Sequence, residues 1–172
     1  EMREAVMHFA TSVLVRATPR EVFDYLDDPE RIGAHMSGGS LMMAGGSMHY
    51  HLDAEAGRRV GSVIRVEGRM LGLALRVTEV ITERVPPVRK IWKTTGPQRM
   101  IVIDTYRLGF ETLQVEAGTE LRVFIAYTLP ERLPGRLLGR ALAPLYARWC
   151  ASRIAVGTRA HFAQGPGRSR IA

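Results

Sequence analysis

A long amphipathic segment near the end of the chain, residues 134–162, constrains the fold more than any other feature. If an α-helix starts at Gly135 and turns by about 100° per residue, six apolar side chains fall on one narrow stripe. They are Leu138, Leu142, Leu145, Trp149, Val156 and Ala160. Arg136 and Arg140 fall on the opposite side, as in a helix with one face on a core and the other in water. We therefore predict a long helix whose apolar stripe, centred on Trp149, packs on a sheet.

Most of the chain before this segment alternates apolar and polar residues with the period of a β-strand. The expected strands cover residues 7–16, 48–53, 62–70, 73–85, 90–95, 100–110 and 119–129. The phase becomes irregular near Thr78, where we expect a β-bulge, and Pro86-Pro87 cannot continue a ladder. These features predict an antiparallel sheet that curls around the long helix and encloses a cavity.

A short motif after the first expected strand resembles a known family. Thr18 and Glu21 have the spacing of a capping box, and Pro19 suits the first helical position because no donor is needed there. The run Ala17-Thr18-Pro19-x-Glu21-Val22-Phe23-x-x-Leu26-x-Asp28-Pro29 resembles the opening of the START/Bet v 1-like (SRPBCC, polyketide cyclase/dehydrase) superfamily. The later strands, the Pro86-Pro87 turn before a strand with Trp92, and the long C-terminal helix extend this resemblance over residues 7–163.

The resemblance implies an α+β helix-grip fold. Such a fold has a seven-stranded antiparallel sheet curled around a long C-terminal helix, two short helices after strand 1, and a cavity for apolar ligands. Residues 7–163 would form one domain, with 1–6 and 164–172 as flexible termini. The superfamily shares no universal catalytic residue, so no catalytic role is carried over. Pro144, inside the long helix, departs from the plainest pattern and bears on which side chains the helix aims inward.

Composition supports a chain with one core. The 172 residues are 46% hydrophobic, enough for a single core, and no Pro/Gly/Ser linker divides them. No run of about 18 uncharged apolar residues is present, and residues 1–4 lack the apolar segment of a signal peptide. We expect a cytoplasmic protein. Cys150 is the single cysteine, so it has no disulfide partner within the chain, and it suits a packed helical position.

The positive charge is concentrated at the C-terminal end. Residues 131–172 contain eight arginines and one acidic residue, whereas residues 1–130 balance 16 basic against 16 acidic residues. Because a basic surface attracts anionic partners, Arg136 and Arg140 are candidates for docking on an anionic membrane. The alternative is an ordinary solvated face in an arginine-rich protein. RNA binding is a further alternative, but no stacking aromatic residues accompany the arginines, so a nucleic-acid partner is not expected.

Large side chains on the apolar faces of the expected strands and helix are the candidates for lining the cavity. They are Met48, Tyr50, Met70, Trp92, Tyr106, Tyr127 and Trp149. Glycine pairs flank Leu41, Met42 and Met43 in the segment 37–47. This segment is either a lid over the cavity mouth, since methionine adapts to varied apolar partners, or a surface loop whose Met side chains are tucked against the core.

Few motifs indicate chemistry. The sequence has no phosphate-binding glycine loop, Gly-x-Ser-x-Gly elbow, His-Glu-x-x-His helix or Cys-x-x-Cys pair, and we expect no cofactor. His49, His51 and Asp53 share one strand face, but a metal site normally needs further ligands, so no metal is expected. The acid/base candidates on strands are Glu67, Glu79, Asp104, Tyr106 and Tyr127. We single out Asp104 and Tyr106 as catalytic candidates, because a carboxylate among apolar neighbours suits proton transfer.

Three classes of function remain. The leading hypothesis is a carrier or sensor that binds a small hydrophobic or lipid-like ligand between sheet and helix. A polyketide cyclase or dehydratase is the second, and a basic module that contacts an anionic membrane or RNA is the third. The sequence leaves open whether a reaction is catalysed, which ligand is bound and whether the protein forms oligomers.

Overall fold

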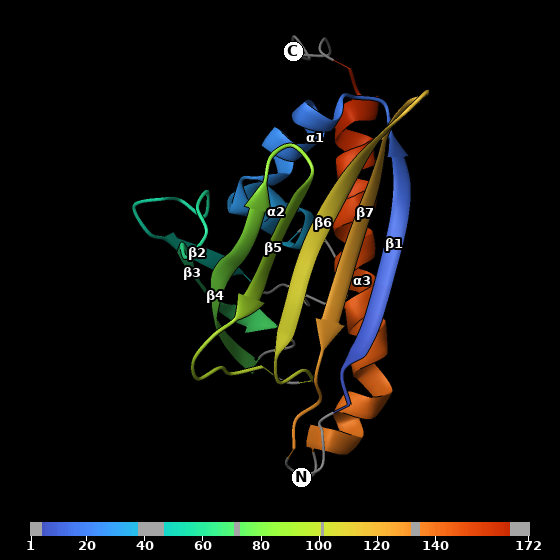
Figure 1. Cartoon of the computed structure of the whole chain (residues 1–172). Helices are drawn as coiled ribbons and strands as arrows, with labels where there is room; N and C mark the ends of the chain where they lie inside the picture. The colour runs from blue at the N-terminus through green and yellow to red at the C-terminus, as the bar shows by residue number, and fades with distance from the viewer. Residues whose placement is uncertain (1–4, 38–46, 71–72, 101, 132–134, 166–172) are drawn as a thin grey trace, which may run out of the picture.

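The computed structural model describes residues 5–37, 47–70, 73–100, 102–131 and 135–165. Over these residues, three helices and seven strands follow one another (Figure 1). They are β1 (Met7–Val15), α1 (Pro19–Leu26), α2 (Pro29–Ser37), β2 (Met48–Leu52), β3 (Val63–Met70), β4 (Leu73–Val85), β5 (Arg89–Thr94), β6 (Tyr106–Val115), β7 (Gly118–Tyr127) and α3 (Gly135–Ala163).

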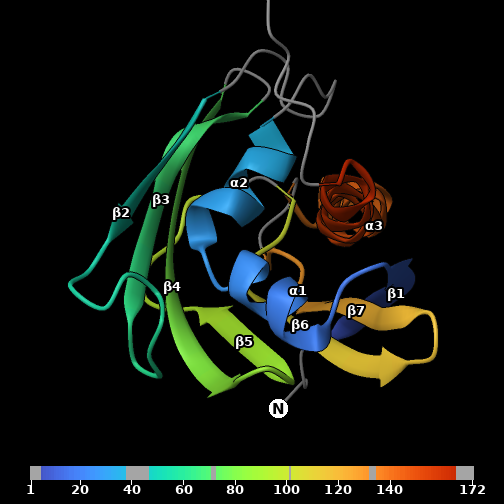
Figure 2. The same cartoon turned by 90° about the horizontal axis from the view of Figure 1, so that it is seen from above.

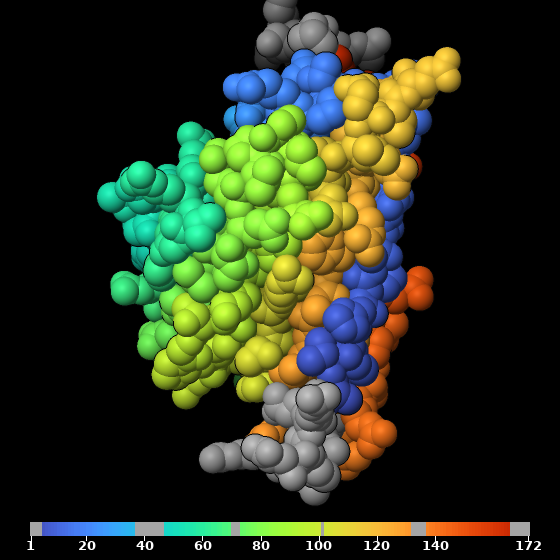
Figure 3. Space-filling model, in the orientation of Figure 1, coloured from blue at the N-terminus to red at the C-terminus, as the bar shows by residue number. Residues whose placement is uncertain are grey.

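The strands form one antiparallel sheet in the order β1-β7-β6-β5-β4-β3-β2. The first strand pairs with the last, with Met7 opposite Tyr127. In the space-filling view, β1 accordingly lies beside the last strands of the sheet (Figure 3). The sheet is strongly curved, and all three helices lie on its concave side (Figure 2). The predicted helix-grip architecture is confirmed.

The motif after β1 folds as the sequence predicted. The backbone N–H of Thr18 donates to Glu21 Oε2 over 2.8 Å, and the N–H of Glu21 donates to Thr18 Oγ1 over 3.3 Å. This capping box starts α1, whose Phe23 and Leu26 are fully buried. The ring centroid of Phe23 lies 5.4 Å from that of Phe110 in β6, which fixes α1 over the middle of the sheet.

The orientation of α3 differs from the prediction, although its bounds agree. The side chains that face the sheet are mostly small: Gly139, Ala143, Ala147, Cys150, Ala151, Ile154, Ala155 and Thr158. The predicted apolar stripe instead faces outward, with Leu138 46% and Leu145 57% exposed and Leu142, Val156 and Ala160 exposed as well. Small side chains let the helix backbone lie close to β1 and β7. The helix therefore packs through its small residues, and the larger leucines face outward.

Some irregular features also differ from the expectation. The expected bulge on β4 is present and lies between Ile81 and Glu83, slightly beyond Thr78. Strand β6 begins at Tyr106, not at residue 100. Residues just before it form a connection in which the N–H of Asp104 donates to the carbonyl of Thr128 over 3.0 Å.

Helix α3 continues through Pro144 without a break in its assignment. The expected hairpin turn at residues 71–72 and most of the segment 37–47 lie outside the described residues. Within the described part of the chain, no helix is long and apolar enough to cross a bilayer.

Candidate functional site

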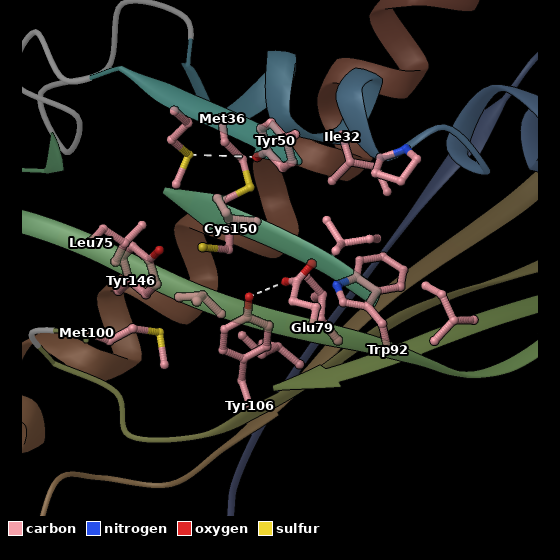
Figure 4. Close-up of a pocket in the computed structure, with 18 of the residues that line it drawn as sticks. Ile32, Met36, Tyr50, Leu75, Glu79, Trp92, Met100, Tyr106, Tyr146 and Cys150 are labelled. Atoms are coloured by element: carbon pink, nitrogen blue, oxygen red, sulfur yellow. Dashed lines mark hydrogen bonds between the residues drawn. The ribbon is translucent and has the colours of Figure 1, made fainter. Parts of the chain in front are cut away.

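A cavity lies between the concave face of the sheet and the helices α2 and α3 (Figure 4). The inward faces of β2 to β7 supply most of its wall. Ile32 and Met36 of α2 and Tyr146 and Cys150 of α3 supply the opposite side. Its volume is about 60 Å³. Apolar side chains dominate the wall, so the site is suited to an apolar ligand.

The structure brings together four of the seven side chains predicted to line the cavity. Met48 and Tyr50 of β2, Trp92 of β5 and Tyr106 of β6 lie in its wall. Their part in ligand binding stays a prediction. The side chain of Met70 lies outside the described residues.

The other two predicted lining residues are not part of the wall. Tyr127 is buried at the end of β7, where it is paired with Met7 of β1 and Tyr106 of β6. Trp149 is half-buried on the outward side of α3, where its ring centroid lies 5.8 Å from that of Tyr146. Its placement follows from the reversed orientation of the helix.

The acid in the cavity is Glu79 rather than Asp104. Asp104 is exposed in the connection before β6, so its predicted place among buried apolar neighbours is wrong. Glu79 of β4 is 8% exposed and points into the cavity (Figure 4). The alternation of β4 could have indicated it, because Leu75, Val77 and Glu79 share one strand face, but the phase near Thr78 was ambiguous.

Glu79 is hydrogen bonded to two aromatic side chains. The hydroxyl of Tyr106 donates to Glu79 Oε1, and the indole N–H of Trp92 points toward the same carboxyl. Burial raises the pKa of Glu79 to about 7, and these two donors and the charge of Lys90 only partly oppose that rise. The carboxyl is therefore present in both protonation states near neutral pH.

The hydroxyl and thiol groups of the cavity stay uncharged in that range. Burial raises the pKa of Tyr50, and it raises the pKa values of Tyr106 and Tyr146 well above the ordinary value. Burial also raises the pKa of the Cys150 thiol to about 12, which agrees with the prediction of a packed cysteine and is unsuited to a nucleophile. Glu79 is thus the cavity group that titrates near neutrality.

A buried ion cluster lies beside the cavity. Lys90 of β5, 1% exposed, donates from Nζ to the carbonyl and Oδ1 of Asp27 at the end of α1, both over 2.8 Å. Arg84 of β4 donates to the other oxygen of the same carboxylate over 2.7 Å. Burial opposes ionisation of Asp27, but these hydrogen bonds outweigh it and lower its pKa. The cluster joins α1 to the sheet.

The histidine face of β2 has structural contacts. His49 and His51 are exposed, and His51 Nε2 lies 3.8 Å from Glu67 Oε2. Asp53 accepts hydrogen bonds from Ser62 Oγ and from the N–H of Val63, over 2.6 and 2.7 Å. Among the described residues, no group of three or more potential metal ligands lies together.

The C-terminal arginines have different environments. Arg140 is exposed, as predicted, and the side chain of Arg136 lies outside the described residues. Arg153 donates from Nε to the carbonyl of His35 over 3.0 Å and so joins α3 to α2. His35 Nε2 in turn lies 2.9 Å from the hydroxyl of Tyr25 in α1.

Solved structures share this architecture, although the sequence matches no family model and no curated protein. Norcoclaurine synthase from Thalictrum flavum matches with a TM-score of 0.66 and 9% identity, over 95% of this chain and 98% of that one. The di-domain ARO/CYC BexL from the BE-7585A biosynthetic pathway matches with a TM-score of 0.65 and 19% identity, over 96% of this chain and 52% of that one.

A third match is Ara h 8.0201, with a TM-score of 0.60 and 11% identity, over 90% of this chain and 98% of that one. At such low identity the likeness concerns the fold. It agrees with the resemblance carried by residues 17–29. The chain therefore has the helix-grip fold of the START/Bet v 1-like superfamily.

Proposed function

We propose that this protein binds a small hydrophobic molecule in the cavity between its sheet and α3, as a carrier or sensor. The observation that carries the proposal is the cavity itself, with a mainly apolar wall and a few converging polar groups. Its fold neighbours include norcoclaurine synthase, solved in complex with a transition-state analogue. The likeness to that protein supports a ligand site in this fold.

The size of the cavity indicates that its wall moves when a ligand enters. A volume of about 60 Å³ is well below the roughly 300–1,000 Å³ of pockets for drug-sized ligands. Three methionines, Met36, Met48 and Met100, belong to the wall, and methionine side chains adapt readily to new neighbours. We expect these side chains to rearrange around the bound molecule.

Fluorescence titration with the apolar dye N-phenyl-1-naphthylamine tests the proposal. We expect binding at micromolar dye, and loss of that binding in Leu75→Trp, which fills the cavity from β4. The matched control is Leu113→Trp, at a side chain that is 63% exposed on β6, and it should bind like the wild type. Folded protein that binds no dye, or equal binding by both variants, would contradict the proposal.

The exposed N-terminal end of α3 supports docking on an anionic membrane as a second part of the function. Leu138, Leu142 and Leu145 are exposed along one side of the helix, and Arg140 is exposed on the same element. Arg140 lies on the other side of the helix from these leucines, so the docking surface is the exposed N-terminal end of α3 as a whole. Exposed apolar side chains suit adsorption to a membrane surface, and each arginine near an anionic surface contributes about 1 kcal/mol. Tyr146 lines the cavity, and its ring lies beside that of Trp149 on the outward side of the same helix.

Sedimentation with vesicles tests this docking. We expect the wild type to sediment with vesicles that contain anionic lipid, and neither Arg140→Glu nor Leu138→Asn with Leu145→Asn to do so at the same salt concentration. Arg136 remains part of the predicted surface. Equal binding to neutral and anionic vesicles, or none to either at low salt, would reduce this surface to a solvated face.

A polyketide cyclase or dehydratase is the alternative function of the cavity. Glu79 and Tyr106 favour it, because a carboxyl that titrates near neutrality can transfer protons. The likeness in fold to the ARO/CYC protein BexL also supports this alternative. Incubation of 2-acetylnaphthalene with the protein in D₂O separates the two functions. An enzyme would speed hydrogen exchange next to the carbonyl and Glu79→Gln would not, whereas a carrier would leave the exchange rate unchanged.

A further inference from the structure

We infer that Glu79 is the recognition group of the cavity and that its protonated carboxyl donates a hydrogen bond to an oxygen acceptor, such as a carbonyl, on an otherwise apolar ligand. This inference rests on the proposed function and names the ligand class for the same site. It predicts that a carbonyl ligand binds together with a proton.

The partners of Glu79 leave its acid proton available. The hydroxyl of Tyr106 donates to Oε1, and the indole of Trp92 can only donate. Both neighbours therefore use acceptor positions of the carboxyl. When Glu79 is protonated, its O–H group faces a mainly apolar cavity, where a ligand oxygen would satisfy it. A buried donor without an acceptor is costly, so such a ligand is favoured.

The charged and titratable groups around Glu79 agree with this assignment. The ammonium of Lys90 on β5 is held by the carbonyl and carboxylate of Asp27. From β2 and α3, Tyr50, Tyr146 and Cys150 contribute hydroxyl and thiol groups whose pKa values burial raises. These hydroxyl and thiol groups stay neutral between pH 6 and pH 8.

The protonation state of Glu79 then sets the preferred ligand. Burial holds its pKa at about 7, so the protonated form falls from nine-tenths of the population to one-tenth between about pH 6 and pH 8. A ligand that needs this form loses affinity in proportion, because its apparent Kd is the intrinsic value divided by the competent fraction. The expected weakening is about tenfold.

Two naphthalenes of nearly equal shape measure this effect. 2-Acetylnaphthalene has a carbonyl acceptor, and 2-ethylnaphthalene has none. The Kd of each compound is measured by displacement of the dye N-phenyl-1-naphthylamine. The affinity of the dye itself is measured separately at each pH. We expect the Kd of the acetyl compound to rise about tenfold from pH 6 to pH 8. The Kd of the ethyl compound should stay constant.

Variants assign the effect to Glu79. Glu79→Gln keeps a neutral donor in place, so it should bind the acetyl compound at both pH values as the wild type does at pH 6. Glu79→Leu should bind the two compounds alike. Glu83→Gln changes a carboxylate on the same strand that is paired with Arg89 outside the cavity, and it should keep the wild-type pH dependence. Dye binding confirms that each variant is folded.

The outcomes separate this inference from the proposed function. If the dye binds the wild type but the acetyl compound shows no pH dependence, or keeps it in Glu79→Gln, the role of Glu79 is wrong and the cavity still binds ligands. If no dye binds at any pH, the proposed function fails and the inference fails with it.

Discussion

At the scale of single residues, the most consequential groups are two buried carboxyls with different partners. Asp27 is surrounded by Lys90 and Arg84, which hold it ionised. Glu79 has only donors without charge in direct contact, and its pKa rises. The carboxylate of Asp27 stabilises the fold, and the carboxyl of Glu79 gives the cavity an acid group that titrates near neutral pH.

Asp27→Asn should destabilise the protein strongly. The change leaves the ammonium of Lys90 buried without its counter-charge, and breaking a buried ion pair in this way costs about 3–5 kcal/mol. Urea unfolding measures the loss. The double variant Asp27→Asn with Lys90→Met removes the unpaired charge and should recover part of it. A double variant as unstable as Asp27→Asn alone would show that the pair does not act as described.

The protonation of Glu79 should make stability depend on pH. Its folded pKa of about 7 lies above the ordinary value of 4.5, so the folded state binds the proton more tightly than the unfolded state. This contribution is fully present below pH 4.5 and is lost as pH rises through 7, a change of about 3 kcal/mol. The difference in unfolding free energy between the wild type and Glu79→Gln, measured from pH 4.5 to pH 8, isolates it. A constant difference would contradict the raised pKa.

At the scale of elements, α3 shows which sequence signals determined its packing. The regular spacing of Ala143, Ala147 and Ala151 places small residues on the buried face of α3, which packs against β1 and β7, and Gly139 continues this row against Val102 and Pro130. The leucine stripe on the opposite side is more hydrophobic, but its bulk would hold the helix away from the sheet. The helix could be predicted from periodicity alone, whereas its orientation depended on the fit of side-chain volumes against the sheet.

Ala151→Leu tests this orientation. Ala151 is fully buried, so the larger side chain should force α3 away from the sheet and cost about 1–3 kcal/mol. Leu145→Ala, at a residue that is 57% exposed, should change the unfolding free energy little. Thermal and urea unfolding of the two variants give the comparison. If Leu145→Ala were less stable than Ala151→Leu, the result would support the orientation expected from the leucine stripe.

Gly157 should be required where α3 meets α2. A methyl group there would collide with the imidazole of His35, which is bonded to Tyr25. Gly157→Ala should therefore destabilise the protein by about 1 kcal/mol through the lost hydrogen bond, despite the better helix propensity of alanine. In a His35→Ala background the same change should be stabilising. Urea unfolding of the wild type, the two single variants and the double variant forms a double-mutant cycle that measures this coupling. If Gly157→Ala changed the unfolding free energy equally in both backgrounds, the contact with His35 would be excluded.

At the scale of the whole molecule, the sequence predicted the architecture better than the site. Strand alternation, the capping box at Thr18 and the long terminal helix predicted a sheet curled around a helix, and the resemblance to the START/Bet v 1-like superfamily implied the helix-grip fold. Met48, Tyr50, Trp92 and Tyr106 lie in the cavity wall, and their part in ligand binding stays a prediction. Glu79 was not singled out, because the strand phase was ambiguous near the bulge after Ile81.

The cavity between the sheet and α3 is proposed to hold an apolar ligand, and the methionines of its wall report on such a ligand directly. Met36, Met48 and Met100 belong to the cavity wall, whereas Met7 lies on β1 outside it. Methyl NMR spectra of the protein labelled at methionine, recorded during titration with 2-acetylnaphthalene, follow all four. We expect the resonances of Met36, Met48 and Met100 to shift with saturation and that of Met7 to stay in place. Saturable shifts confined to Met7, or none at all, would contradict a ligand site in the cavity.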